Sequence, residues 1–388
     1  MDMKPSVMFL LGSGTSRPAK FPSTSILTSQ IFSGNNIIRG SDSKYYWNNQ
    51  ANTFEKNQTN DYLPKIILLF KTIKNIMKSY VKEEPLTYEI LYYFIQQLCD
   101  YESGELLNMA LYPFINEVKT KMPLSNEGKI TRYVELFYEA EVYIRNTVWS
   151  KLAKVPLNKH THLAFLSDAI NDKDISMVNI TTLNHDLLIE KHFDDQKIHL
   201  NDGFDASLNG VRYWKNNFRD KNNLLKIHGS IDWFSWSVNR DGWFNEKIAI
   251  IPDEWNGVYT LPNGDIMSRL PDKEPYILIG TFNKIYEYTE SIFSDIYNQF
   301  RILLKKTNNL IVSGYSFGDK GINTAILDWL YTNAGNKIII IHHDPASLLA
   351  NNVRSAIRKA YTGQAKTNFV TIPKQIQDTS WKEIKTKI

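Results

Sequence analysis

Residues 6–16, SVMFLLGSGTS, decide the fold class of this chain. Ser6–Leu11 is a short, uninterrupted apolar run, and the turn residues Gly12–Ser16 follow it directly. Apolar runs without polar alternation are typical of strands that are buried on both faces of a parallel sheet. Glycines after such a strand let the backbone approach a phosphate closely. A plain strand-to-loop turn explains the motif equally well, because it lacks the third glycine of a dinucleotide fingerprint and the lysine of a P-loop.

Similar apolar runs recur along the chain and predict further strands of one sheet. They are Ser176–Thr181, Leu224–His228, Tyr276–Leu278, Leu310–Val312 and Lys337–Ile341. A helix predicted at about Ile285–Lys306 lies between two of these runs, as a crossover helix should. Its apolar residues on one face are Phe293, Ile296, Phe300 and Leu303. The order predicts an open α/β sheet, which binds ligands outside the carboxyl ends of its strands.

The region between the first two predicted strands has a different pattern. Gly40–Asn60 is polar and rich in Asn, Ser and Tyr, which indicates a loop, and helical periodicity extends from about Tyr62 to Asn171. We therefore expect residues 1–35 and 172–388 to form the α/β domain, and residues 36–171 to form a loop plus a helical insertion. Pro252–Pro275 contains Pro, Gly, Asn and Asp at short intervals, which predicts a long loop or an irregular hairpin.

Composition excludes several classes of protein. The 388 residues are 43% hydrophobic, which excludes wholesale disorder, and the single Cys99 excludes an internal disulfide framework and a multi-cysteine zinc cluster. No apolar run reaches about 18 residues, and the N-terminus lacks signal-peptide architecture, so we expect a cytoplasmic protein without a membrane association. The net charge of +4 suits an anionic small molecule better than a nucleic acid.

Two polar motifs follow the second and third predicted strands. In TTLNHDLL, Thr181–Leu188, the side chains of Asn184 and Asp186 are placed to hold a ribose or a carboxamide. Capping of the following helix is the favoured alternative for this motif alone. In LKIHGS, Leu225–Ser230, His228 has the chemistry of a general base, although a lone histidine is more often structural.

Two further motifs follow the last two predicted strands. SGYSFGD, Ser313–Asp319, fits either a ligand-binding turn or a glycine turn that leads into a capped helix. In IHHDP, Ile341–Pro345, the carboxylate of Asp344 could accept hydrogen bonds from ribose, although an Asp-Pro turn is slightly favoured. His342 and His343 are expected to point to opposite faces of a strand and so not to share a metal ion.

Together and in this order, the motifs resemble those of the sirtuin family, which has a Rossmann-like NAD-binding sheet. They are Gly12–Ser16, Thr182–Asp186, His228–Ser230, Gly314–Ser316 and His343–Pro345, and the resemblance covers about residues 5–30 and 176–346. Tyr276–Thr281, with Gly314–Asp319 and Ile322-Asn323, resembles the sirtuin-like branch of bacterial anti-phage effectors more than the deacylases. The chain's size is most similar to that of sirtuin-like subunits that assemble with a HerA-type ATPase.

Two departures separate the chain from the deacylase sirtuins. Where those enzymes carry two cysteine pairs for zinc, this chain has Trp233, Trp236 and Trp243 and no cysteine, so we expect no zinc and no other metal. Where they carry G-I-P-D-F-R, this chain has Lys20–Ser25, KFPSTS, in which only Pro22 matches. The fold class that we expect is therefore a sirtuin-like parallel α/β sheet with a large helical insertion and no zinc module.

The resemblance implies an NAD+ hydrolase that depletes NAD+ in abortive, anti-phage defence. It implies His228 and Asn184 as catalytic residues, and it implies ten residues that hold NAD+, here a substrate. These ten are Gly12, Ser13, Gly14, Thr15, Ser16, Asp186, Ser230, Gly314, Ser316 and Asp344. We expect gating by homo-oligomer assembly, by a HerA-type ATPase partner, or by both. The alternatives are an NAD-dependent protein deacylase and a non-catalytic module that binds NAD or ADP-ribose.

Overall fold

The computed structural model describes most of the chain. The described residues are 4–40, 43–47, 62–80, 86–124, 130–205, 211–219, 221–240, 243–251, 259–260, 266–267, 274–281, 283–349 and 353–388. Backbone contacts divide the chain into two compact units. Unit 1 comprises residues 1–21, 155–278 and 284–388, and unit 2 comprises residues 22–154 and 279–283. The domain limits expected from the sequence, after residues 35 and 171, stay a prediction.

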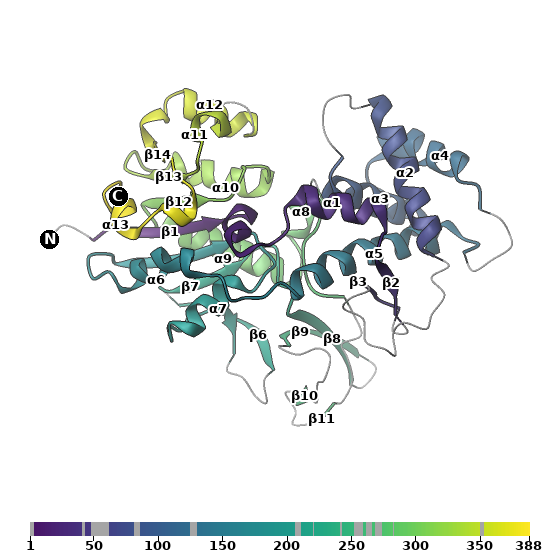
Figure 1. Ribbon diagram of the computed structural model, residues 1–388, viewed down its shortest axis with the longest axis horizontal. Coiled ribbons are helices and arrows are strands. Elements are labelled where there is room, and N and C mark those ends of the chain that lie inside the picture. The colour runs from purple at the N-terminus through teal and green to yellow at the C-terminus, as the bar shows by residue number, and fades with distance from the viewer. Residues whose placement is uncertain are drawn as a thin grey trace. The chain divides into compact units, whose positions relative to one another are not determined.

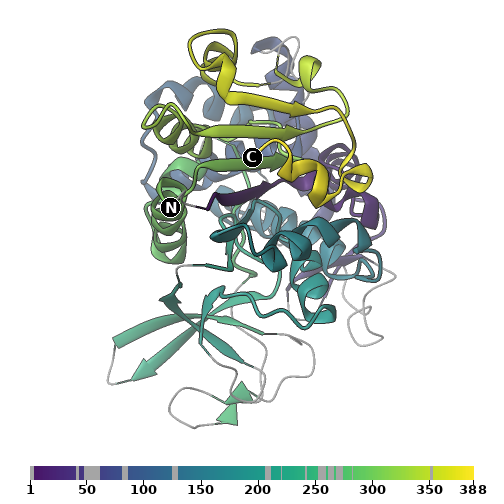
Figure 2. The ribbon, with the colours of Figure 1, turned by 90° about the vertical axis from the view of Figure 1, so that its left-hand side faces the viewer.

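Unit 1 is built on a six-stranded parallel sheet, which confirms the predicted α/β class (Figure 2). Its strands are β1 (Ser6–Leu11), β4 (Met177–Thr182), β7 (Asn223–Lys226), β12 (Asn309–Ser313), β13 (Lys337–Ile341) and β14 (Phe369–Ile372). Their order across the sheet is β14-β13-β12-β1-β4-β7, and every neighbouring pair is parallel. Five of the predicted apolar runs correspond to strands of this sheet, whereas β14 was not predicted.

The predicted strand at Tyr276–Leu278 is wrong. This segment makes a single antiparallel bridge, between Ile277 and Gly229. Its backbone folds back on the turn after β7, with the amide of Leu278 donating to the carbonyl of His228 at 2.9 Å and that of Tyr276 donating to Trp233 at 2.7 Å. The apolar run is therefore buried by a loop and not by a sheet, a distinction that hydrophobicity alone does not make.

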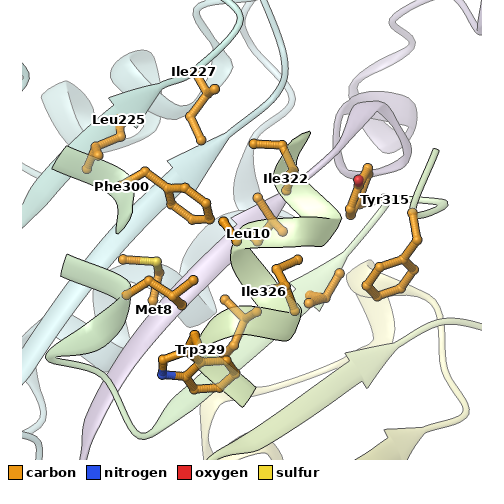
Figure 3. Packing of buried hydrophobic residues seen from close by; sticks show 14 of the residues in the cluster. Met8, Leu10, Leu225, Ile227, Phe300, Tyr315, Ile322, Ile326 and Trp329 are labelled. Atoms are coloured by element: carbon orange, nitrogen blue, oxygen red, sulfur yellow. The ribbon is translucent and has the colours of Figure 1, made fainter. Parts of the chain in front are cut away.

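Helices cover both faces of the parallel sheet. One face packs against α9 (Ser291–Lys305), α10 (Lys320–Leu330) and α12 (Ser355–Thr362), with Leu10 of β1 and Ile326 of α10 among the buried residues in Figure 3. The other face packs against α6 (Ala164–Asn171) and α13 (Trp381–Lys385). There the ring of Phe9 lies 5.6 Å from that of Phe165 and 6.2 Å from that of Trp381.

The helix predicted at Ile285–Lys306 is two helices. The short α8 (Lys284–Glu287) is followed by α9, because the backbone leaves helical geometry at Glu290, where φ is −117° and ψ is 142°. The apolar face predicted for this segment is confirmed, since all four of its residues are buried. Further helices described in unit 1 are η1 (Ser13–Ala19), η4 (Thr161–Leu163), α7 (Leu188–Asp195), α11 (Pro345–Ser347), η6 (Lys366–Asn368) and η7 (Ile376–Asp378).

A four-stranded antiparallel sheet of order β5-β6-β9-β8 also belongs to unit 1. Its strands are β5 (Gly203–Phe204), β6 (Arg212–Asn217), β8 (Trp233–Arg240) and β9 (Trp243–Ile250). The sequence interpretation did not foresee this sheet. Within the predicted loop or hairpin at Pro252–Pro275, β10 (Tyr259–Thr260) pairs antiparallel with β11 (Ile266–Met267). Residues 252–258, 261–265 and 268–273 lie outside the described residues.

Unit 2 is mostly helical, as its periodicity predicts (Figure 1). Its helices are α1 (Thr24–Ser33), α2 (Leu63–Tyr80), α3 (Tyr88–Ser103), η3 (Met109–Leu111), α4 (Tyr112–Lys121) and α5 (Tyr133–Ala153). A hairpin of β2 (Ile37–Arg39) and β3 (Tyr45–Trp47) packs on α5, where Tyr45 donates to Glu139 at 2.6 Å. The strand β3 falls inside the predicted loop Gly40–Asn60, and residues 41–42 and 48–60 of that loop lie outside the described residues. Among the helices that the structure describes, none is long and apolar enough to cross a membrane.

Candidate functional site

The loops after β1 and β12 meet backbone to backbone. The amide of Gly12 donates to the carbonyl of Ser313 at 2.9 Å, and that of Gly14 donates to Gly314 at 3.0 Å. A Cβ on Gly12 would lie 2.4 Å from the oxygen of Gly314, and a Cβ on Gly314 would lie 2.3 Å from the nitrogen of Thr15. Gly314 also has a φ of +66°, which glycine adopts without strain. The GSG turn therefore allows two strand ends to approach so closely.

This meeting point is where the direction of strand order reverses. From β1 the chain adds β4 and β7 on one side, and it later adds β12, β13 and β14 on the other. A reversal of strand order is where open α/β sheets place a ligand crevice, at the carboxyl ends of the strands.

A pocket of about 510 Å³ lies at this edge of unit 1, against the carboxyl ends of β1, β12, β13 and β14. Its volume is in the range typical of small-molecule sites. Its lining residues are Gly14, Arg17, Pro18, Ser313, Gly314, Tyr315, Ser316, Ile341, His342, His343, Leu348, Lys374, Gln375, Ile376 and Gln377. Two cations line the pocket, the exposed Arg17 and Lys374, which pairs with Glu383 at 2.9 Å. The pocket is thus suited to a polar, anionic ligand, and three predicted residues line it, Gly14, Gly314 and Ser316.

Beside the glycine turn, three predicted residues form a buried hydrogen-bonded chain. The amide group of Asn184 donates to the carbonyl of Gly12 at 3.1 Å and to the hydroxyl of Ser16 at 3.0 Å. That hydroxyl donates to Oδ2 of Asp186 at 2.7 Å, whose Oδ1 accepts from the amide of Leu188 at 3.1 Å. Asp186 therefore accepts from the first residue of α7, in partial agreement with the capping alternative. Asn184 and Asp186 both help to hold the turn after β1.

Two side chains that the sequence interpretation did not use support this chain. Lys226, at the end of β7, donates from its buried ammonium to the carbonyl of Asp186 at 2.5 Å and to Glu190 at 2.6 Å. His162 donates from Nε2 to the carbonyl of Thr15 at 2.9 Å. Lys226 is visible in the LKIHGS motif, but only the fold brings it next to the motif after β4.

His228 lies in a second buried cluster, with Tyr288 and Asp319. Its Nε2 is 2.7 Å from the hydroxyl of Tyr288 and 3.2 Å from Oδ2 of Asp319. The hydroxyl of Tyr288 donates to the same Oδ2 at 2.8 Å. The side chains of His228 and Asp319 are only 5% and 6% exposed, so this contact is shielded from bulk water.

The charges in this cluster are set by its neighbours. Burial opposes ionisation of Asp319, but the hydrogen bond and charge of His228, together with Lys284, hold the pKa of the carboxyl well below its usual range. Burial, reinforced by the charge of Asp319, raises the pKa of Tyr288 well above its usual value. At neutral pH the cluster therefore holds a carboxylate and a neutral phenol beside the imidazole.

The other predicted residues occupy separate places in unit 1. Ser13 is exposed at the start of η1, and Ser230 is fully buried, with its hydroxyl 3.5 Å from the carbonyl of His185. Asp344 caps α11, accepting from the amide of Ser347 at 3.0 Å, and is not among the residues that line the pocket. The structure thus favours the turn-and-cap alternative for Asp344.

The expectation that His342 and His343 point apart is wrong. Both follow β13 instead of lying within it, so strand alternation does not apply, and their ring centroids are 4.2 Å apart. Nδ1 of His342 accepts from the amide of Asp344 at 3.0 Å. Within the described part of the chain, no group of three or more His, Cys, Asp or Glu side chains could hold a metal ion.

Comparisons with known proteins agree with the resemblance in part. Residues 178–365, a little under half of the chain, match the family model of the SIR2-like domain. A Sir2 homologue solved with NAD is 11% identical, with 98% of this chain and 88% of that chain covered and a TM-score of 0.40. A Sir2 homologue solved with ADP-ribose is 11% identical, with 98% and 91% covered and a TM-score of 0.39. A search of curated proteins returned no significant match.

Proposed function

We propose that this protein binds NAD+ and hydrolyses its bond to nicotinamide. The observation that carries the proposal is the pocket at the meeting point of the loops after β1 and β12, within a chain that matches the SIR2-like domain over residues 178–365. Such a domain implies the use of NAD. Gly14, Gly314 and the exposed Arg17 line the same pocket, so glycines without side chains and one cation surround a space suited to a diphosphate.

The proposed reaction converts NAD+ and water into ADP-ribose, nicotinamide and one proton. The cationic pyridinium leaves as neutral nicotinamide, so positive charge develops on the ribose as the glycosidic bond breaks. His228 would accept the proton that the attacking water, or a ribose hydroxyl, releases, a role that typically contributes ~10²–10⁴ in rate. Asn184 would position the water or the nicotinamide ribose, Asp186 and Ser230 the nicotinamide end, and Ser316 the adenosine side.

The test is incubation of the purified protein with NAD+ and chromatographic analysis of the products. His228→Ala and Asn184→Ala should each abolish nicotinamide release, and circular dichroism should show that each variant is folded. A His228→Ala protein with wild-type turnover would remove His228 from the mechanism. Product that forms only when an acylated peptide is present would identify a deacylase instead.

One observation favours a second candidate, a non-catalytic NAD or ADP-ribose binding module. The polar groups of Asn184, Ser16 and Asp186 bond to one another and to the turn after β1, as structural residues do. Under this function, isothermal calorimetry would show binding of NAD+ or ADP-ribose without turnover, and Arg17→Ala would weaken that binding. Turnover by the purified chain excludes this candidate.

We propose further that the activity serves anti-phage defence in the cytoplasm and is gated by assembly, as a homo-oligomer or with a HerA-type ATPase. Unconstrained NAD+ loss would be toxic, which is why gating is needed. Unit 2 exposes large apolar side chains in one short stretch, with Leu107 80% and Met109 62% exposed, which suits a protein contact. Light scattering with and without the candidate ATPase tests assembly, and a monomer that hydrolyses NAD+ at full rate would refute the gating.

A further inference from the structure

We infer that Asp319 and Tyr288 are positioning residues that hold His228 in the tautomer protonated at Nε2, so that Nδ1 is the nitrogen that accepts a proton. The inference concerns the buried cluster that these three side chains form. It deepens the proposed function, because it states which atom of the proposed general base acts. The tautomer itself can be measured without any substrate.

The protons of the cluster can be assigned one by one. Tyr288 has a single phenolic proton, which it donates to Oδ2 of Asp319 at 2.8 Å. The phenolic oxygen, 2.7 Å from Nε2 of His228, must therefore act as an acceptor toward that nitrogen. Oδ2 of Asp319, 3.2 Å from Nε2, belongs to a carboxylate and can only accept. Since both neighbours of Nε2 are acceptors, Nε2 carries a proton, and in the neutral imidazole the lone pair is therefore on Nδ1.

The carboxylate of Asp319 cannot turn away from His228 easily. Its Oδ1 caps α10 by accepting from the amide of Ile322 at 3.0 Å. Its own amide donates to the hydroxyl of Tyr315 at 3.1 Å, and that hydroxyl donates to Asn323 at 2.9 Å. One oxygen is therefore committed to the helix, and the other is aimed at His228 and Tyr288.

The ring of Tyr288 is held just as firmly. It stacks on Tyr297, with centroids 4.6 Å apart and planes within 4°, and a Cβ on Gly321 would lie 2.8 Å from its Cε2. The planes of Tyr288 and His228 are within 19° of parallel. Packing of this kind fixes the rotamer, and a fixed rotamer is what a positioning residue requires.

The backbone of His228 is held by the loop segment Tyr276–Leu278. Its carbonyl accepts from the amide of Leu278 at 2.9 Å, and the next residue, Gly229, has a φ of +77°. A Cβ on Gly229 would lie 2.0 Å from the carbonyl oxygen of Tyr276. The imidazole therefore enters the cluster from a rigid turn, which supports a single ring orientation.

The same carboxylate would stabilise the imidazolium that forms when Nδ1 accepts a proton, as a buried Asp does for a catalytic His. Among the described residues, two further titratable groups near the cluster are His185, with its centroid 6.3 Å from that of His228, and Lys284. Burial and the charges of His228 and Lys284 lower the pKa of His185 well below its usual value, so His185 stays neutral. Asp319, in contact with Nε2 at 3.2 Å, is placed to compensate the new charge.

The decisive experiment is long-range ¹H–¹⁵N spectroscopy of the whole chain labelled at histidine, with the His228 signals assigned by their loss in His228→Asn. The wild type should show His228 as the Nε2–H tautomer at pH 7.5. In Asp319→Asn the amide oxygen can keep the cap on Ile322 while its NH₂ group faces Nε2. Because that neighbour is now a donor, His228 should change to the Nδ1–H tautomer.

The activity of the same variants provides the second measurement. Asp319→Asn should lower the kcat for NAD+ hydrolysis by about 10²–10⁴-fold, and Tyr288→Phe, which keeps the carboxylate, should lower it by about 10-fold. The control is Asp328→Asn on the same helix α10, whose side chain is 60% exposed, and its kcat should match that of the wild type. Melting temperatures and circular dichroism establish that each variant is folded.

The outcomes separate the two proposals. Wild-type protein with His228 as the Nδ1–H tautomer would overturn the inference, whether or not NAD+ is hydrolysed. Nε2–H in the wild type, with a change of tautomer in Asp319→Asn, supports the positioning role even if no NAD+ is hydrolysed, in which case only the proposed function fails. A folded Asp319→Asn protein that keeps the Nε2–H tautomer and the wild-type kcat would overturn the positioning role.

Discussion

At the scale of single residues, the glycines of the pocket wall make the sharpest prediction. Gly314→Ala should destabilise unit 1 and abolish binding of NAD+. Its φ of +66° costs an alanine about 1–2 kcal/mol, and the new Cβ would lie 2.3 Å from the backbone nitrogen of Thr15. The two loops must then separate, which removes the contact between Gly14 and Gly314. Urea unfolding and calorimetry with NAD+ measure the two effects.

A matched control lies four residues along the same loop. A Cβ on Gly318 would have Oγ of Ser316, 3.8 Å away, as its nearest neighbour. Gly318 is also absent from the positive-φ residues of the described chain. Gly318→Ala should therefore leave both stability and NAD+ binding within error of the wild type. Equal losses in Gly314→Ala and Gly318→Ala would show that the loop tolerates no side chain at all, and that the close approach is not the cause.

Site residues were predictable from the sequence where a short motif contains them. The glycines of GSGTS and SGYSFGD were identified because they directly follow apolar runs that predict strands. His228 was identified because it is the last residue of such a run. Tyr288 and Asp319 were not identified as partners of His228, because 60 and 91 residues separate them from it. Asp319 was visible as an acid after a glycine turn, but only the crossover through α9 brings it to the end of β7.

At the scale of elements, the helix α9 provides a test of how the sheet is covered. Phe300 is fully buried on the face that packs on β7, and Phe300→Ala should destabilise the protein by about 3–5 kcal/mol through lost burial and a cavity. Ile302 is 49% exposed two residues later on the same helix, and Ile302→Ala should cost less than about 1 kcal/mol. Urea melts of the two variants give the comparison, and similar costs would contradict the assigned face.

Element prediction succeeded where burial is complete and failed where it is partial. The strands β1 and β13 have almost every residue buried, so their sequences SVMFLL and KIIII read as continuous apolar runs. The edge strand β14 has the sequence FVTI with two of its residues only half-buried, and its short pattern does not stand out from a loop. Tyr276–Leu278 shows the opposite error, since its burial comes from a loop packed against the turn of His228.

At the scale of the whole molecule, strand order explains why the candidate residues fall into separate groups. The reversal between β1 and β12 places the pocket on the β12–β14 side of the sheet, whereas Asn184 and His228 follow β4 and β7 on the other side. Sequence order alone does not contain this reversal, because a strand can pair on either side of its predecessor. The ordered motifs therefore predicted which strand ends matter, but not which ends would share one pocket.

One buried and two half-buried histidines of unit 1 predict how the stability of the protein depends on pH. Burial, aided by nearby histidines, lowers the pKa of His192 from 6.5 to about 4, and burial also lowers the pKa of His162 and His185. Between pH 6.5 and 4 these three side chains bind more protons in the unfolded chain than in the folded chain, so their contribution to the free energy of unfolding falls as the pH is lowered. Burial raises the pKa of Glu190 to about 7, so Glu190 contributes with the opposite sign in this range. His192 alone accounts for roughly 3 kcal/mol of that loss at most.

His192→Gln tests this argument, because glutamine can still donate to the hydroxyl of Ser167, 3.2 Å from Nε2, but takes up no proton. Its free energy of unfolding, measured by urea melts from pH 7.5 to 4.5, should fall less steeply than that of the wild type, and His162 and His185 should maintain the remaining slope. His199 is exposed, so His199→Gln should keep the wild-type slope. Asp172, whose pKa is lowered to about 2 chiefly by Lys385, loses its contribution only below about pH 4 and cannot mimic the effect. A wild-type slope in His192→Gln would mean that His192 is protonated in the folded protein, and the pH dependence would then have to come from other groups, His162 and His185 among them.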